Sequence, residues 1–173
     1  ELLLVLEAAM REGKIKKMPI YVQGMVWDIT AIHTAYPDFL NKDLRRMIYH
    51  KDENPFLSDV FKKVGSRKEQ EKIMENEEPC IILATAGMLN AGASLEYFKK
   101  MAGNARNSLV MVTYQGQGTL GRRIQDGERK IIFTDEGRAS EVEIKMGIHS
   151  ITDFTGHAGR NELMNFVKDL SPR

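Results

Sequence analysis

Apolar and polar positions along this chain follow two periods in alternation. Short apolar runs of strand length recur at 19–23, 60–64, 80–84 and 108–113, and apolar side chains at helical spacing occupy most of the stretches between them. A continuous run such as 80–84 is typical of a strand buried on both faces of a parallel sheet. The pattern therefore predicts an α/β fold with a mostly parallel open sheet flanked by helices.

The same periodicity predicts the helices and two further strands. Helices are expected over 1–12, over 25–35, from Asp38 as N-cap, from Ser66 through Glu75, over 94–101, up to Gln125, and over 159–170. Strands at 130–133 and 139–146 are expected to form an antiparallel edge.

Composition narrows the class of protein. The chain has 173 residues, 42% of them hydrophobic and 28% charged, which excludes a disordered, collagenous or disulfide-built chain. Its single cysteine, Cys80, lies in an apolar run and is interpreted as a core residue in a reducing compartment. No apolar run reaches the ~18 residues of a membrane span, so a cytoplasmic protein without membrane partners is expected.

Charge indicates where an anionic partner could bind. The 25 Lys and Arg nearly balance the 24 Asp and Glu, so contact with RNA would have to come from local clusters. One cluster is the polar face of the helix after Asp38, with Lys42, Arg45, Arg46 and His50. The charge-dense stretch 66–75 is interpreted as a solvated helix face.

Glycines follow three of the predicted strands. Gly24 comes directly after a strand, and Gly87 and the pair Gly116 and Gly118 follow within about five residues of one. In open α/β sheets ligands collect at the carboxyl ends of the strands, and glycine lets a backbone approach a ligand closely. This edge of the sheet is therefore the expected binding site.

Three interpretations of the last glycine segment stay open. Gly116, Gly118 and Gly121 match the spacing of a dinucleotide fingerprint, but the second half of that unit is poorly defined. Two interpretations are favoured over that one: a tight turn, or a cradle for phosphate or RNA backbone completed by Thr119, Arg122 and Arg123. In the earlier loop, Met88 and Leu89 are interpreted as core beneath the loop, or Met88 as a support for a base or ribose.

The histidines give one candidate for proton transfer. No two of the four share the spacing of a zinc site, so no metal centre is expected within this chain. His157 follows Gly156 at a predicted loop-to-helix junction, where it could exchange a proton or cap the helix.

Four motifs in order carry a resemblance to a known family. They are Pro19-Ile20-Tyr21-Val22, Ala84-Thr85-Ala86-Gly87-Met88-Leu89, Tyr114-Gln115-Gly116-Gln117-Gly118-Thr119-Leu120-Gly121 and Phe154-Thr155-Gly156-His157-Ala158-Gly159-Arg160-Asn161-Glu162-Leu163. The chain resembles the β-CASP domain of metallo-β-lactamase-type ribonucleases. It is most similar to archaeal homologues of the endonuclease subunit of the cleavage and polyadenylation specificity factor, and less similar to bacterial ribonuclease J.

The resemblance implies a domain organisation and a division of labour. It implies a β-CASP domain at 1–152, then a motif B loop and helix at 153–173 leading back into a metallo-β-lactamase domain absent from this chain. Single-stranded RNA would enter the cleft between the two domains, where two zinc ions held by the absent domain activate water. His157 matches the motif B histidine, so it is the expected catalytic residue.

The resemblance also sets the functional expectations. The family's H-x-H-x-D-H zinc motif is missing here, so the chain by itself is expected to be inactive. The full-length protein is expected to be an enzyme of pre-mRNA 3′-end cleavage or RNA degradation. Endonuclease and exonuclease modes, and a homodimer, stay open, as do a nucleotide-binding domain and a non-catalytic scaffold. The expected RNA contacts are Gly87, Met88, Gly116, Gly118, Thr119, Arg122 and Arg160.

Overall fold

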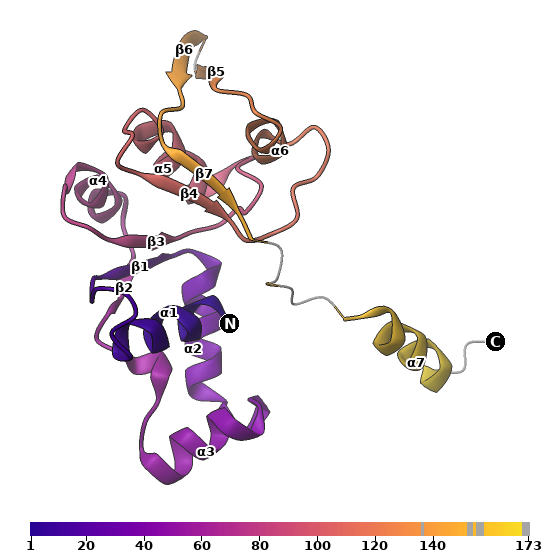
Figure 1. The fold of residues 1–173 in the computed structure, drawn as a ribbon. Helices are drawn as coiled ribbons and strands as arrows, with labels where there is room; N and C mark the ends of the chain where they lie inside the picture. Colours follow the sequence, from indigo (N-terminus) through magenta and orange to yellow (C-terminus); the bar gives the residue numbers. More distant parts are fainter. Residues whose placement is uncertain (136, 152–153, 155–157, 171–173) are drawn as a thin grey trace.

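A three-stranded parallel sheet forms the centre of the fold. The computed structural model describes residues 1–135, 137–151, 154 and 158–170. In it, β1 lies between the other two strands and runs parallel to both, as Figure 1 shows. Ile20 and Val22 of this central strand are fully buried, because the sheet is covered on the face they occupy. The strands are β1 (Ile20–Gln23), β2 (Phe61–Val64) and β3 (Ile81–Leu83).

The remaining four strands form two separate two-stranded ladders. β4 (Ser108–Met111) pairs in parallel with β7 (Gly147–Ser150), and β5 (Lys130–Asp135) pairs antiparallel with β6 (Arg138–Glu143). The mostly parallel α/β prediction and the antiparallel pair are confirmed. The predicted strand 139–146 was wrong at its end, because Ile144 and Met146 leave the ladder and pack into a core. The sequence pattern missed β7, whose Gly-Ile-His-Ser lacks an apolar run.

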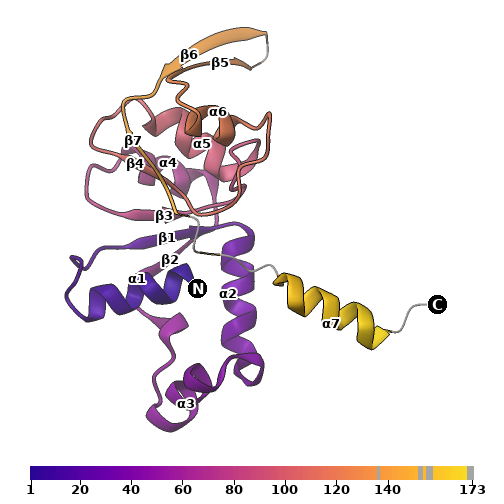
Figure 2. The same ribbon diagram turned by 45° about the vertical axis from the view of Figure 1, so that its right-hand side comes forward.

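Helices cover both faces of the three-stranded sheet. Residues of α1 and α2 pack with Ile20 and Val22 on one face, and residues of α4 and α5 pack with Tyr21 and Val64 on the other. Figure 2 shows the same layers from a second direction. The helices are α1 (Leu2–Arg11), α2 (Met25–Ala35), α3 (Lys42–Lys51), α4 (Arg67–Glu75), α5 (Gly92–Met101), α6 (Leu120–Gln125) and α7 (Arg160–Leu170).

The start of α3 differs from the predicted one. Asp38 is not its N-cap, because Pro37 begins a short 3-10 turn, η1 (Pro37–Phe39). The cap is Asn41, whose side-chain oxygen accepts a hydrogen bond from the backbone N–H of Leu44 at 2.9 Å. Asp38 instead accepts a bond from the Tyr49 hydroxyl at 2.8 Å, which ties η1 to α3. A second turn, η2 (Pro55–Leu57), follows α3.

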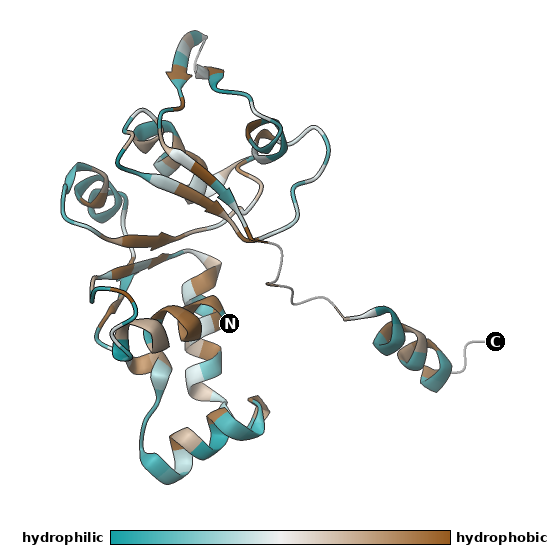
Figure 3. Cartoon of the chain, in the orientation of Figure 1, coloured by the Kyte–Doolittle hydropathy of each residue, from teal (hydrophilic) through white to brown (hydrophobic). Residues whose placement is uncertain are grey.

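The last helix has no buried residue. In Figures 1 and 2 α7 stands apart from the rest of the chain. Figure 3 colours it partly hydrophilic and partly hydrophobic, and its large apolar residues are exposed. Across the described part of the chain, no helix is both long and apolar enough to cross a membrane.

Tyr97 links α5 to the end of β1, and this contact gives a test of the packing. Its hydroxyl donates to Gln23 Oε1 at 2.7 Å, and burial raises the pKa of Tyr97 to about 12. Because the folded state favours the neutral phenol, its contribution to stability is intact below pH 10 and is lost as the pH rises towards 12. Tyr97→Phe should cost about 1 kcal/mol of unfolding free energy at neutral pH.

Chemical denaturation of both proteins at several pH values measures this effect. The difference in stability between wild type and Tyr97→Phe should shrink above pH 10. A difference that stays constant across that range would contradict the account.

Candidate functional site

Three loops meet where β1, β3 and β4 end. A Cβ added to Gly24 would lie 3.2 Å from Thr85 Oγ1, and one added to Gly87 would lie 2.5 Å from Thr113 Oγ1. The first contact joins the loops after β1 and β3, and the second joins the loops after β3 and β4. The glycine loops therefore meet as expected, but not at the edge of one sheet, because β4 pairs with β7 in a separate ladder.

Gln115 holds the two later loops together. Its side chain is only 2% exposed, and its amide nitrogen donates at 3.0 Å to the backbone oxygens of both Gly87 and Thr113. A buried amide bonded to two carbonyls resists displacement, because breaking those bonds leaves polar groups without water. The sequence analysis gave Gln115 no role of its own, because Gly87 and Thr113 become its neighbours only in the folded chain.

A second set of bonds connects the same loops at the start of α6. The backbone N–H of Gly121 donates to the Met88 carbonyl at 3.0 Å, and that of Leu120 donates to Asn90 Oδ1 at 3.4 Å. A Cβ on Gly121 would fall on the Gln115 side-chain oxygen. Gly121 therefore serves close packing between loops, which is a structural reason for glycine at this position.

The loop after β3 is anchored by an apolar side chain. Leu89 is 3% exposed in the core formed with Phe98, Ile124 and Ile131, although its φ of 58° lies in the left-handed region that costs a branched residue energy. The core interpretation of this loop is therefore right for Leu89. Met88 is only half-buried, and its sulfur lies 3.6 Å from where a Gly116 Cβ would be.

Thr119 uses its hydroxyl inside the turn. The hydroxyl donates to the Gly116 carbonyl at 2.7 Å and accepts from the N–H of Arg122 at 3.2 Å, as the N-cap of the six-residue α6. These bonds favour the tight-turn interpretation of the segment. Gly118, with φ +82° and no atom within 4 Å of an added Cβ, is the open point of the loop.

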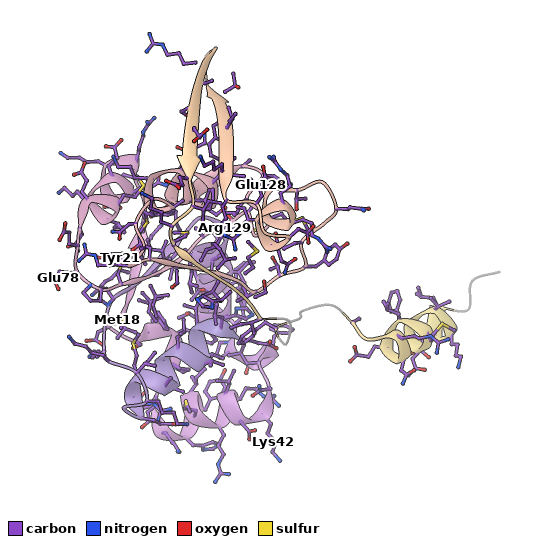
Figure 4. The ribbon with its side chains drawn as sticks, turned by 45° about the horizontal axis from the view of Figure 1, so that its top comes forward. Met18, Tyr21, Lys42, Glu78, Glu128 and Arg129 are labelled. Carbon is purple, nitrogen blue, oxygen red and sulfur yellow. The ribbon has the colours of Figure 1, made fainter. Side chains whose placement is uncertain are left out.

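The arginines of α6 are engaged in ion pairs. Arg122 Nε lies 2.9 Å from Asp126, and this hydrogen bond raises the pKa of the guanidinium. Arg123 binds Glu128 through two nitrogens, each at 2.7 Å, which lowers the pKa of the Glu128 carboxyl. Figure 4 shows Glu128 beside α6. Both arginines would have to leave an exposed carboxylate, or share it, to bind phosphate.

The structure gathers most of the predicted RNA contacts and leaves one apart. Gly87, Met88, Gly116 and Thr119 lie at the joined loops, whereas Arg160 begins α7, away from them in Figures 1 and 2. His157, the predicted catalytic residue, and Gly156 lie outside the described residues. Among the residues described, no group of three or more His, Cys, Asp or Glu side chains could hold a metal ion.

The fold and the loop edge agree with two family matches. The Beta-Casp domain family matches residues 1–124, and the Zn-dependent metallo-hydrolase RNA specificity domain matches residues 141–173. The chain therefore belongs to the β-CASP family, and the resemblance carried by its motifs is confirmed. The boundary between residues 152 and 153 stays a prediction.

Curated relatives share the whole length of this chain. It is 49% identical over 174 residues to the transcription termination factor FttA of Methanothermobacter thermautotrophicus, and 48% identical to that of Pyrococcus abyssi, with all of this chain covered in both. The identity to FttA of Methanocaldococcus jannaschii is 46% over 173 residues. The chain spans about a quarter of each relative, 27% of its length.

Two alanine substitutions test whether the loops dock as described. Gly121→Ala should destabilise the protein by about 1–3 kcal/mol, because the methyl group overlaps the buried Gln115 side chain. Gly116→Ala is the matched control, since its Cβ would meet no atom closer than 3.5 Å. Thermal unfolding measures both, and equal melting temperatures for the two variants would show that the loops are not packed in this way.

Proposed function

We propose that this chain is the RNA-binding part of a zinc-dependent ribonuclease, and that the joined glycine loops form its contact with single-stranded RNA. The observation that carries the proposal is the pair of hydrogen bonds from the Gln115 amide to the Gly87 and Thr113 carbonyls, which we call the Gln115 clamp. It holds the two loops together, while the backbone at Gly118 has free space around it. A backbone held rigid at the ends of strands can approach a sugar-phosphate chain with little loss of entropy. The matched RNA specificity domain supports the choice of ligand.

The zinc chemistry belongs, on this proposal, to a metallo-β-lactamase domain outside this chain. The description of the matched family as a Zn-dependent metallo-hydrolase supports zinc, and the chain spans only 27% of its relatives, which leaves room for such a domain in the full-length protein. Two zinc ions bound there would supply an activated water for phosphodiester hydrolysis. We assign His157 to proton transfer at the leaving oxygen, and Arg160 to the phosphate, on the motif alone.

The relatives indicate the biological context. They are named transcription termination factors, so we propose that the RNA is a transcript and that its cleavage accompanies termination. On this proposal, the expected 3′-end cleavage would occur during transcription. A scaffold without activity is the alternative, and it predicts normal RNA binding with no cleavage in the full-length protein.

Substitutions of Arg122 and of its ion-pair partner Asp126 test whether Arg122 binds RNA. Arg122→Gln should weaken binding to any RNA sequence and reduce the slope of log affinity against log salt by about 0.7, since one phosphate contact is lost. Asp126→Asn should raise affinity about two- to fivefold, because it frees Arg122. Fluorescence anisotropy at several salt concentrations measures both.

The matched control is a similar exposed ion pair on a helix away from the glycine loops. Glu71→Gln breaks the exposed Arg67–Glu71 pair on α4, at 3.2 Å, and should leave RNA affinity unchanged. If Asp126→Asn and Glu71→Gln raise affinity equally, the effect is one of net charge, and Arg122 is not an RNA contact.

The catalytic assignment predicts a split between rate and affinity. His157→Ala in the full-length protein should lower the cleavage rate about a hundredfold or more and leave RNA affinity within about twofold. Single-turnover cleavage and anisotropy in chelator give the two numbers. Equal losses of rate and affinity would make His157 a structural residue.

A further inference from the structure

A second surface with the chemistry of a single-strand binding site lies at the far end of α2. Exposed aromatic rings and cations adjoin one another there on η1 and α3, in a part of the chain that the glycine-loop function does not use. We call it the aromatic-basic surface, formed by Tyr36, Phe39, Lys42, Arg45, Arg46 and Tyr49.

The cations share one side of α3. Lys42, Arg45, Arg46 and Tyr49 are spaced at three, four and seven residues, which places them on one helical face, and all four are exposed. The half-buried apolar residues Leu44, Met47 and Ile48 lie on the opposite face. Figure 3 shows α3 as mostly hydrophilic, and Figure 4 shows Lys42 at the outer side of the molecule.

The cations of α3 differ from the arginines of α6 in having no ion-pair partner among the described residues. No carboxylate of the described residues forms an ion pair with Lys42, Arg45 or Arg46, whereas Arg122 and Arg123 each have a partner on or next to their own helix. From Lys42 to Lys51 the helix carries four Lys or Arg and one Asp. An unneutralised basic face is complementary to a polyanion.

The aromatic rings adjoin these cations. Phe39 is 88% exposed and Tyr36 60% exposed, and both line a hollow of about 410 Å³ together with Ile32 and His33. The bond from the Tyr49 hydroxyl to Asp38 fixes η1, which carries Phe39, against the basic helix. Rings held exposed beside cations are what base stacking on single-stranded nucleic acid requires.

The position of this surface connects it to the glycine loops. α2 begins directly after Gly24, at the loop edge, and its 11 residues span about 16 Å to the start of η1. Figures 1 and 2 both show α2 running away from the sheet with α3 at its far end. One RNA strand that occupies the loop edge could therefore continue to the aromatic-basic surface.

We infer that the aromatic-basic surface binds a flanking segment of the same single-stranded RNA, by stacking bases on Phe39 and Tyr36 and pairing phosphates with Lys42, Arg45 and Arg46. The inference rests on the proposed function for the identity of the ligand. A protein with an acidic surface is the competing occupant, and the experiment separates the two.

The test compares two RNA lengths in the full-length protein, with chelator present to prevent cleavage. The triple variant Lys42→Gln/Arg45→Gln/Arg46→Gln should bind a single strand of about 16 nucleotides at least tenfold more weakly, with a salt slope reduced by about 2. Its affinity for a strand of about 4 nucleotides, which reaches only the loop edge, should stay within about twofold. Phe39→Ala should weaken the long single strand about tenfold and leave duplex RNA unaffected.

The matched control is Arg67→Gln/Lys68→Gln/Lys72→Gln, which removes three exposed cations from α4. Equal weakening by the control, or unchanged binding of the long strand by the α3 variant, overturns the inference and favours a protein occupant. If the unaltered protein binds neither RNA, the proposed function itself fails. Weakening by the α3 variant without an effect of Phe39→Ala overturns the stacking and the single-strand specificity.

Discussion

The joined loop edge of this protein depends on one buried amide. Gln115 sits on the loop after β4, yet its nitrogen bonds to a carbonyl of the loop after β3 as well as to its own loop. Gly121 leaves room for that side chain, and the N–H of Gly121 ties the same two loops through Met88. These bonds hold the two glycine segments together before any ligand arrives, so the proposed RNA contact would need little ordering on binding.

The core beneath explains why the clamp can hold. Leu89 from the first loop and Ile124 from α6 enter the same apolar cluster as Met111 of β4 and Ile131 of β5. Apolar side chains anchor the loops in the core, and the Gln115 hydrogen bonds join the loops to each other. The ion pairs of α6, in contrast, are partly exposed to water and add little to stability, so breaking them to bind phosphate, as the proposed function requires, would cost little.

The sequence predicted the parallel strands and the meeting of the glycine loops, because buried runs and glycines after strands are local signals. It did not predict β7, because this strand has no apolar run of its own and is defined by its pairing with β4. It also misplaced the start of α3, whose N-cap is Asn41 and not Asp38. Gln115 could not be identified from the chain alone, since its partners Gly87 and Thr113 become neighbours only through the fold. The cations on α3 were visible from periodicity, but their lack of carboxylate partners and the exposed rings beside them required the structure.

Hydrogen exchange in the presence and absence of single-stranded RNA tests the central claim most directly. RNA binding should slow exchange at backbone amides of both loops, 85–92 and 113–121, over the same range of RNA concentration, because Gln115 makes the two loops one surface. RNA binding that protects other parts of the protein while leaving both loops unchanged would contradict the account.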